Sequence, residues 1–277
     1  MAANTVNGIA LITGGASGIG RETGYSFAEA GALGIVFADK NLPGAQEAVE
    51  HSKTLAKNPK FRAIAAEVDV TSLESVKAMI NQAVQEFGRI DYSVHSAGVG
   101  IDSNNPIDEV STEEFDSLAN INTKGTLLCM REVSKVMKDQ EPLTVITRNG
   151  ERKVGRGSII NLGSAHSYVA LPGKIPYVTS KFAVLGMTKT AALDCSAYDV
   201  RVNAVCPSWV ATPMMQRDFD RTPQLQEFIK AAVPVGRMAA PEEVGDVIVF
   251  LCSPSASYIN GTGLLIDAGV TLSLHLG

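Results

Sequence analysis

Short apolar runs alternate with longer amphipathic segments along most of the chain. Seven of the apolar runs have the length and flanking residues of buried strands: Gly8–Thr13, Leu33–Ala38, Phe61–Ala66, Ile90–Val94, Ser158–Leu162, Arg201–Val205 and Leu264–Ile266. The main helical segments are predicted at Arg21–Ala30, Leu42–Lys57, Thr71 or Ser72 to Phe87, Ser111 to about Met137, Tyr177 to about Tyr198, and Pro241–Cys252. Strands and helices that alternate in this way form right-handed βαβ units. The pattern predicts an α/β fold, a doubly wound parallel sheet of about seven strands with helices on both faces.

Two segments interrupt the alternation. Residues 140–156 are polar and contain Asn149-Gly150, a strong hairpin-turn signal, so we expect a surface excursion with a small β-hairpin as one form. Residues 207–235 place Met and Phe between polar residues, and we expect a substrate-loop region there. Because the chain shows no linker, composition shift or internal repeat, we predict that residues 1–277 form a single domain.

Composition narrows the class of protein. The chain has 277 residues, of which 45% are apolar and 19% charged, with a net charge of −5 and no Lys/Arg cluster, which argues against a nucleic-acid partner. We see neither a signal peptide nor a membrane-spanning run. The four cysteines and four histidines have no metal-binding spacing. These observations favour a cytoplasmic protein without membrane association or a metal site.

A glycine-rich turn follows the first predicted strand and precedes the first helix. The segment Thr13 to Gly20 has the spacing TGxxxGxG, with Gly14, Gly18 and Gly20 at its fixed positions. Glycines in this context permit a tight turn and close backbone approach to a pyrophosphate at a helix N-terminus. An ordinary strand–helix turn is the alternative reading. The strand–turn–helix context favours dinucleotide binding.

Asp39 ends the second predicted strand, 19 residues after Gly20. An acid at this place accepts hydrogen bonds from the adenosine ribose hydroxyls and repels a 2′-phosphate. Capping of the helix that starts near Asn41 is the alternative. Ser17 offers a phosphate no counter-charge, whereas Lys40 argues the other way. We therefore predict NAD as the cofactor, with NADP less favoured.

Tyr177 and Lys181 lie four residues apart in a predicted helix and so share one of its faces. A cation beside a phenol lowers the phenol pKa, and such a pair transfers a proton to or from an alcohol oxygen. Ser164, upstream, offers a hydroxyl to the same oxygen. On spacing alone, simple packing of Tyr177 and solvation of Lys181 would be the better reading, so the assignment depends on the rest of the chain.

Taken together, the order and spacing of these motifs resemble the short-chain dehydrogenase/reductases, whose fold is Rossmann-like, over nearly the whole chain. The resemblance implies a catalytic set of Asn122, Ser164, Tyr177 and Lys181. In this set Tyr177 exchanges the proton, Ser164 orients the substrate oxygen, and Asn122 positions a water linked to Lys181. The cofactor-binding residues so implied are Gly14, Ser17, Gly18, Ile19, Gly20, Asp39, Asp69, Val70, Ala97, Gly98, Tyr177, Lys181, Pro207, Val210 and Thr212.

The chain departs from the family pattern in three places. The usual NNAG motif is His95-Ser96-Ala97-Gly98, which puts the strand-bracing contacts of the asparagines in doubt. Ser208 replaces the glycine that usually follows Pro207, and residues 140–156 are longer than the usual join. A similar excursion occurs in fungal members that tailor polyketides and terpenoids.

The sequence thus predicts an NAD(P)-dependent oxidoreductase acting on a ketone or secondary alcohol. Residues that flank the catalytic set in sequence are candidates for the substrate pocket, and their apolar, aromatic character favours a bulky, weakly polar substrate: His166, Tyr168, Trp209, Met214 and Met215. A catalytically silent cofactor-binding scaffold or redox sensor, and non-redox chemistry on the same fold, are the alternatives. We expect a homodimer or homotetramer, because apolar residues on the helices from Ser111 and Tyr177 exceed what one sheet face needs and because these helices form a two-fold interface in the resembled family.

Overall fold

A seven-stranded parallel sheet forms the centre of the molecule. The computed structural model describes residues 6–272. The strands run in the order β3 (Arg62–Glu67), β2 (Gly34–Asp39), β1 (Ile9–Thr13), β4 (Tyr92–His95), β7 (Gly157–Leu162), β8 (Val200–Pro207) and β9 (Gly263–Ile266). The order reverses between β1 and β4, and ligands of such sheets bind beyond the carboxyl ends of the strands at this point. The predicted α/β, Rossmann-like fold is confirmed.

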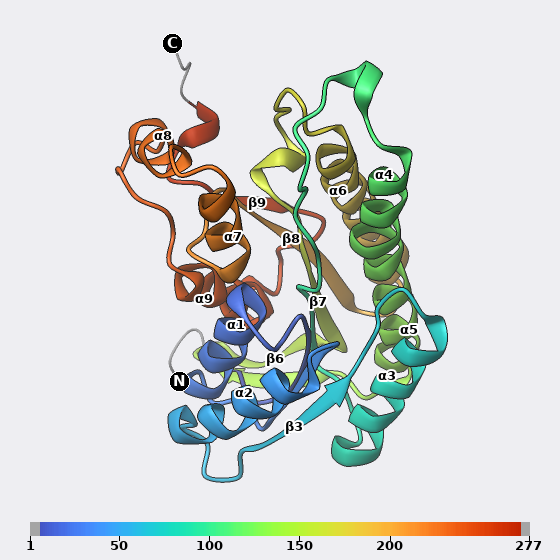
Figure 1. The fold of residues 1–277 in the computed structure, drawn as a ribbon. Coiled ribbons are helices and arrows are strands. Elements are labelled where there is room, and N and C mark those ends of the chain that lie inside the picture. The colour runs from blue at the N-terminus through green and yellow to red at the C-terminus, as the bar shows by residue number, and fades with distance from the viewer. Residues whose placement is uncertain (1–5, 273–277) are drawn as a thin grey trace.

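Helices cover both faces of the sheet (Figure 1). One face carries α1 (Gly18–Glu29), α2 (Leu42–Leu55) and α9 (Pro241–Cys252). The other carries α3 (Leu73–Phe87), α4 (Thr112–Leu118), α5 (Thr126–Asp139) and α6 (Ile175–Ser196). Helix α1 begins at Gly18, earlier than the predicted Arg21, because the glycine turn itself starts the first helical turn.

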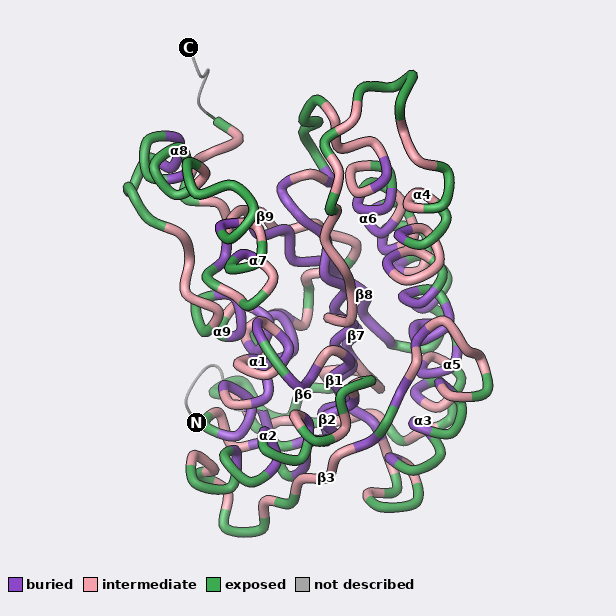
Figure 2. Tube along the Cα trace, viewed as in Figure 1, coloured by how far each residue is buried: buried purple, intermediate pink, exposed green. Residues whose placement is uncertain are grey.

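Two buried apolar clusters fill the layers on either side of the sheet. Phe27, Phe37 and Ile248 belong to the cluster beneath α1 and α9, whereas Met79, Val133 and Ile159 belong to the cluster beneath α3 and α5. The central strands β1, β7 and β8 are almost entirely buried, as parallel strands covered on both faces should be (Figure 2). This rigid frame fixes the strand ends from which the polar residues project.

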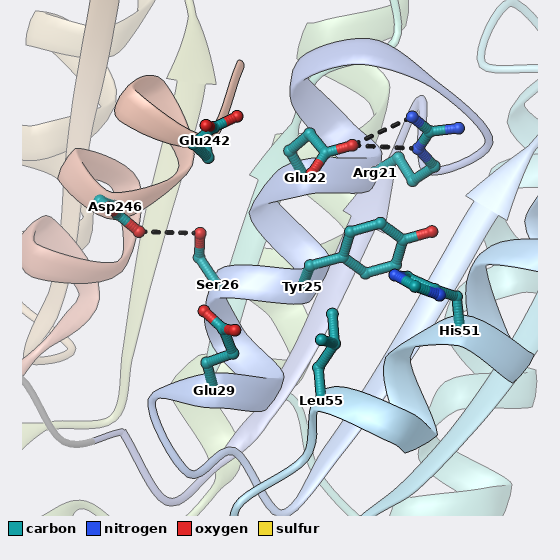
Figure 3. Close-up of a pocket in the computed structure, with 9 residues that line it drawn as sticks. All are labelled: Arg21, Glu22, Tyr25, Ser26, Glu29, His51, Leu55, Glu242 and Asp246. Atoms are coloured by element: carbon teal, nitrogen blue, oxygen red, sulfur yellow. Dashed lines mark hydrogen bonds and ion pairs between the residues drawn. The ribbon is translucent and has the colours of Figure 1, made fainter. Parts of the chain in front are cut away.

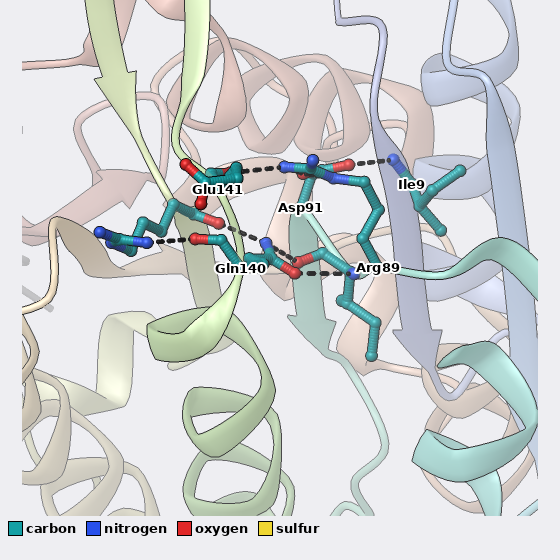
Figure 4. Close-up of polar contacts among 7 residues, drawn as sticks. Ile9, Arg89, Asp91, Gln140 and Glu141 are labelled. Atoms are coloured by element: carbon teal, nitrogen blue, oxygen red, sulfur yellow. Dashed lines mark hydrogen bonds and ion pairs between the residues drawn. The ribbon is translucent and has the colours of Figure 1, made fainter. Parts of the chain in front are cut away.

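The segment 140–156, where we expected an excursion, contains the antiparallel pair β5 (Leu143–Thr147) and β6 (Gly150–Gly155). Its base is tied to the start of β4 (Figure 4). The side-chain amide of Gln140 donates to the carbonyl of Ile90 at 2.7 Å, and Arg89 donates to the carbonyl of Glu141 at 3.1 Å. Arg89 also pairs with the buried carboxylate of Asp91 at 2.7 Å. The hairpin is therefore anchored at the end of the sheet opposite the strand carboxyl ends.

The helical stretch predicted from Ser111 to about Met137 runs without a break from Thr112 to Asp139, but it is not α-helical throughout. A π-helical segment, η2 (Ala119–Gly125), separates α4 from α5 and contains Asn122. The Thr126 hydroxyl donates to the carbonyl of Asn122 at 2.7 Å, while the Thr126 N–H turns to the carbonyl of Thr123. This side-chain bond competes with the regular backbone ladder at that point. Single π-turns of this kind often mark functional sites.

A small lobe follows β8 and contains α7 (Pro213–Arg221) and α8 (Leu225–Ala232). It has a core of its own, built on the buried side chains of Met215, Phe219, Ile229 and Val233. Trp209 packs against this core, with its ring edge-to-face on Phe228 at 6.0 Å between centroids. The lobe therefore holds its shape by internal packing while it lies next to the carboxyl ends of the strands.

Candidate active site

A cleft of about 540 Å³ opens where the strand order reverses. Its walls come from the glycine turn, the ends of β2 and β3, the segment after β4, the α4–η2 helix and the start of α7. Of the residues that we predicted to bind a cofactor, ten line it: Gly14, Ser17, Gly18, Ile19, Asp39, Asp69, Val70, Ala97, Gly98 and Thr212. The lining also contains Lys40, which we weighed as an opposing charge, and Met214, which we predicted only for the substrate pocket. Lining residues that we did not assign to a site from the sequence include Ser96, Val99, Asn120 and Arg217.

The glycine turn has a conformation that other residues would strain. Gly14 and Gly18 have φ values of +71° and +53°, in the left-handed region. A Cβ atom at Gly20 would lie 2.2 Å from the carbonyl oxygen of Gly14, so only glycine allows the turn to close against the helix. The N-terminus of α1 therefore faces the cleft with bare backbone, the arrangement that binds a pyrophosphate.

Asp39 lies at the edge of this cleft with its carboxylate held by backbone. Oδ2 accepts from the N–H of Ala16 at 3.0 Å, and Oδ1 accepts from the N–H of Asn41 at 2.9 Å. The neighbouring Lys40 is turned toward Asp69, with 3.7 Å between Nζ and Oδ2, and its side chain is 82% exposed. The carboxylate of Asp39 thus has no cation beside it in the described part of the chain.

Asn122 fixes the wall of the cleft after β4. Its Oδ1 accepts from the N–H of Val99 at 2.9 Å, and its Nδ2 donates to the carbonyl of Val99 at 3.0 Å and to Ser180 at 3.2 Å. A Cβ at Gly98 would lie 3.1 Å from Asn122 Oδ1. The π-segment therefore connects the cofactor wall to α6, the helix that carries Tyr177.

Tyr177 and Ser164 lie together beyond the end of β7. The ring of His166 meets the ring of Tyr177 edge-on, with 6.0 Å between centroids. Burial raises the pKa of Tyr177, the hydrogen bond from Ser164 acts in the opposite direction, and the charge of Asp218 adds to the increase. The structure thus brings Ser164 and Tyr177 together as predicted, in surroundings that favour the neutral phenol.

Lys181 lies one helical turn after Tyr177, with Nζ 5.5 Å from the centroid of the Tyr177 ring. Its ammonium donates to the carbonyl of Leu162 at 2.9 Å, and burial lowers its pKa to about 8. The expectation that Lys181 lowers the Tyr177 pKa stays a prediction, because burial and Ser164 are the main influences on that group here.

Ser167 is a residue that the sequence reasoning missed. Its hydroxyl accepts from the N–H of Ser164 at 3.2 Å and donates to the carbonyl of Lys181 at 2.8 Å. It therefore links two members of the catalytic set. Its spacing of three from Ser164, typical of a capping turn, was the available signal.

His95 replaces the first bracing asparagine with a buried hydrogen-bonded network. Its Nδ1 lies 2.8 Å from Asn161 Oδ1, and its Nε2 lies 3.0 Å from Ser93 Oγ. The Asn161 amide then donates to Thr188 of α6 at 2.9 Å. Since Asn161 Oδ1 can only accept, Nδ1 carries the proton and Nε2 accepts from Ser93. Burial lowers the pKa of His95 to about 4. A side-chain hydrogen bond between β4 and β7 is therefore present although histidine replaces the usual asparagine, because His95 bonds to Asn161.

The predicted pocket residues separate into two groups. His166 faces Tyr177, and the sulfur of Met214 lies 3.3 Å from where a Cβ of Gly100 would stand. Met215 and Trp209 instead pack in the lobe core, and the Tyr168 hydroxyl donates to the carbonyl of Gly263 at 2.6 Å. These three make their contacts with the lobe and the β9 edge, and their role as pocket walls stays a prediction.

Besides Tyr177 and Lys181, which do not line the cleft, three other predicted cofactor residues lie outside its lining. Pro207 ends the buried strand β8. Val210 is 6% exposed, belongs to the core under α9, and forms a bridge with Ala239. Gly20 lies behind Gly14. They shape the cleft through the backbone rather than by presenting side chains to it.

A second hollow, of about 640 Å³, lies between α1, α2 and α9 (Figure 3). Tyr25 and His51 meet edge-to-face on one side of it, and Ser26 donates to Asp246 at 2.9 Å on the other. It shares no lining residue with the cleft. Within residues 6–272, no cluster of three or more His, Cys, Asp or Glu side chains is placed to hold a metal, and no helix is long and apolar enough to cross a bilayer.

Comparisons with known proteins agree with this geometry. The family model described as enoyl-(acyl carrier protein) reductase matches residues 14–271. The short-chain dehydrogenase anuF of Penicillium roqueforti is 44% identical over 270 residues and 98% of each chain. The short-chain dehydrogenase srdC of Neurospora crassa is 47% identical over 262 residues, 95% of this chain and 96% of that one. The crystal structure of levodione reductase has a TM-score of 0.82 at 29% identity, covering 98% of this chain and all of that one.

The residues of the cleft fit a nicotinamide dinucleotide. The glycine turn leaves space that a Cβ would fill, the α1 N-terminus points into it, and Asp39 offers carboxylate oxygens at the end of β2. Tyr177, Ser164 and Lys181 lie beyond β7, next to the same edge of the sheet. With a family match over almost the whole chain and relatives of 44–47% identity, the protein belongs to the short-chain dehydrogenase/reductase family of NAD(P)-dependent oxidoreductases.

Proposed function

We propose that the protein moves a hydride between NAD(H) and the carbonyl or carbinol carbon of a ketone or secondary alcohol, with Tyr177 as the group that exchanges the proton. The observation that carries this proposal is the placement of Ser164 close enough to Tyr177 to lower the pKa of its phenol, with Lys181 next to Tyr177 on the same helix face. The nicotinamide ring, when bound, supplies the hydride chemistry. The protein contributes orientation and proton transfer.

The roles of the residues follow from their contacts. Ser164 lies close enough to the Tyr177 hydroxyl to lower its pKa, and its own hydroxyl would donate a hydrogen bond to a substrate oxygen placed between them. Tyr177 gives its proton to that oxygen in reduction and takes it back in oxidation. Lys181, fixed by the carbonyl of Leu162, brings a positive charge close to the developing phenolate. Asn122 holds the opposite wall in register through the backbone of Val99.

NAD preference is part of the proposal and rests on Asp39. Its carboxylate stands at the ribose end of the cleft with both oxygens engaged by backbone N–H groups. A 2′-phosphate in this place would meet a negative charge, and Lys40 is directed at Asp69 instead. Like-charge contact in a binding site costs several kcal/mol.

We propose a bulky, weakly polar substrate, in keeping with a tailoring step in secondary metabolism such as polyketide or terpenoid modification. The ring of His166 meets the ring of Tyr177 edge-on, and the apolar side chain of Met214 lines the cleft next to Gly100. The segment after β4 carries polar contacts, since Lys174 donates to the carbonyl of Ser103 at 2.7 Å and Arg221 pairs with Asp102 at 2.6 Å. A substrate with a mainly apolar body and one polar end suits this distribution.

A cofactor-coupled screen tests the proposal. Purified protein is incubated with NADH or NADPH and a library of cyclic and aromatic ketones, and with NAD⁺ or NADP⁺ and the matching alcohols, while the absorbance of the reduced nicotinamide is followed. We expect turnover of at least one bulky ketone–alcohol pair, faster with NAD(H). Binding of NADH without turnover across the library would instead favour a silent cofactor-binding protein.

A further inference from the structure

Helix α7 presents two chemically different faces. Met215 and Phe219, four residues apart and each 8% exposed, face the core of the lobe. Met214 and Arg217, three residues apart, line the dinucleotide cleft. Residues three or four positions apart lie on the same face of a helix, so the spacing of each pair agrees with the side of α7 on which its contacts place it. Of these two cleft-lining residues, Arg217 is the charged one.

The two ends of α7 fix where Arg217 stands. At the first turn, the methyl carbon of Thr212 lies 3.3 Å from where a Cβ of Gly18 would be, so the helix starts against the glycine turn. At the last turn, Arg221 pairs with Asp102 at 2.6 Å, in the segment that continues the wall after β4. Arg217 lies between these anchors. It therefore projects over the stretch of cleft that begins at the glycine turn.

The charges of the cleft leave Arg217 without a counter-ion. Four charged residues line the cleft: Asp39, Lys40, Asp69 and Arg217. Lys40 pairs with Asp69, and Asp39 is held by backbone N–H groups. Within residues 6–272, the side chain of Arg217 takes part in no hydrogen bond or ion pair, and its charge lowers the pKa of Asp218, its neighbour in the sequence. An exposed guanidinium that faces a cleft without a carboxylate partner is suited to an anion.

We propose that Arg217 binds the pyrophosphate of the dinucleotide from the α7 side, opposite the backbone of the glycine turn. This inference rests on the proposed function, because it takes the cleft to hold NAD(H). A guanidinium offers paired N–H donors that match two phosphate oxygens. Such a contact makes the lobe part of the cofactor site.

Binding measurements with ligand fragments test the role of Arg217 without any turnover. Dissociation constants are measured by calorimetry for NADH, for ADP-ribose, which keeps the pyrophosphate but lacks nicotinamide, and for adenosine, which has no phosphate. The variants are Arg217→Gln, which removes the charge, and Arg217→Lys, which keeps it but loses the paired donors. Arg148→Gln is the matched control, since Arg148 is an exposed arginine at the hairpin turn, on an element that does not line the cleft.

We expect Arg217→Gln to weaken NADH and ADP-ribose binding by about tenfold, the scale of a charge-assisted contact that is partly solvated. Adenosine binding should not change, Arg217→Lys should lie in between, and Arg148→Gln should match the wild type. The salt dependence of ADP-ribose binding should also fall in Arg217→Gln. Unchanged ADP-ribose affinity in Arg217→Gln, or an equal loss for adenosine, would overturn the assignment. Failure of the wild type to bind NADH at all would contradict the proposed function together with this inference.

Discussion

The ammonium of Lys181 is anchored on the carbonyl of Leu162, 2.9 Å away, at the end of the strand that leads to Ser164. This bond ties α6 to β7 at the level of the catalytic set. It also takes a charged group into the interior, since Lys181 is 8% exposed and burial lowers its pKa to about 8. The function of this lysine is therefore maintained at a cost in stability.

We expect Lys181→Met to abolish turnover and yet leave the protein at least as stable at pH 7. A pKa lowered from 10.5 to about 8 means that burying the charged ammonium costs ~3 kcal/mol of folding stability at neutral pH. The variant avoids this cost but leaves the carbonyl of Leu162 without its hydrogen-bond donor, which cancels part of the gain. Between pH 8 and 10.5 the unfolded chain binds the proton and the folded chain does not, so wild-type stability should rise relative to the variant. Thermal melts across this range, with the exposed Lys189→Met as control, measure it. A variant that is less stable at pH 7 and shows no pH trend would contradict this account.

Replacing Asp39 should change the choice of cofactor. The wild type should prefer NADH over NADPH by about a hundredfold or more in kcat/KM, because the 2′-phosphate would meet the carboxylate. Asp39→Ala should reduce this ratio strongly, whereas Lys40→Ala should leave it nearly unchanged, since Lys40 is directed at Asp69. A wild-type preference for NADPH, or a ratio insensitive to Asp39→Ala, would make Lys40 the residue to study.

The proposed oligomer depends on fewer apolar residues than the sequence suggested. Three of the apolar residues on these two helices, Leu128, Met130 and Val184, are buried in the core of the same chain. Leu127 on α5 and Phe182 on α6 remain 43% and 47% exposed. We expect light scattering to give a multiple of the 29.2 kDa chain mass, and Leu127→Lys with Phe182→Lys to lower it. Tyr258→Lys, at a fully exposed position elsewhere, should not. A wild-type mass near 29 kDa would rule the oligomer out.

The buried network around His95 should make the protein sensitive to acid. Burial lowers the pKa of His95 from 6.5 to about 4, so between these values the unfolded chain gains a proton that the folded chain cannot accept. Stability is unaffected above pH 6.5 and falls by up to ~3 kcal/mol as the pH approaches 4. The gap in melting temperature between wild type and His95→Asn should therefore narrow or reverse on acidification. The exposed His51→Asn should show no such trend, and identical pH profiles for wild type and His95→Asn would exclude the effect.

The sequence predicted the sheet because its strands are buried on both faces and so appear as short apolar runs. It placed the start of the fourth strand at Ile90, whereas β4 begins at Tyr92, and the backbone N–H of Ile90 donates to the side chain of Gln140, which is distant in sequence, instead of to a neighbouring strand. The π-segment at Asn122 was also out of reach. A side-chain bond from Thr126 and close packing of Gly125 on Val70 produce it, and neither has a periodic signature.

Motif spacing was informative for residues fixed by local backbone and less so for those placed by the lobe. Gly14, Gly18 and Asp39 line the cleft because strand ends and a tight turn determine their positions. Met214 and Met215 are adjacent in sequence but point in opposite directions, and only the packing of α7 on α8 decides which one reaches the cleft. Arg217 was not predicted as a cleft residue, because its position also depends on how α7 packs in the lobe.

The central claim is that Tyr177 exchanges the substrate proton, and Tyr177→Phe tests it most directly. The substitution removes only the hydroxyl, while the glycine turn and Asp39 are untouched. With a substrate from the ketone–alcohol screen, we predict a loss of kcat of at least about 10²–10⁴-fold, the usual contribution of general acid–base catalysis, with the NADH dissociation constant unchanged. A kcat within about tenfold of the wild type, with NADH bound normally, would contradict the assigned role of Tyr177.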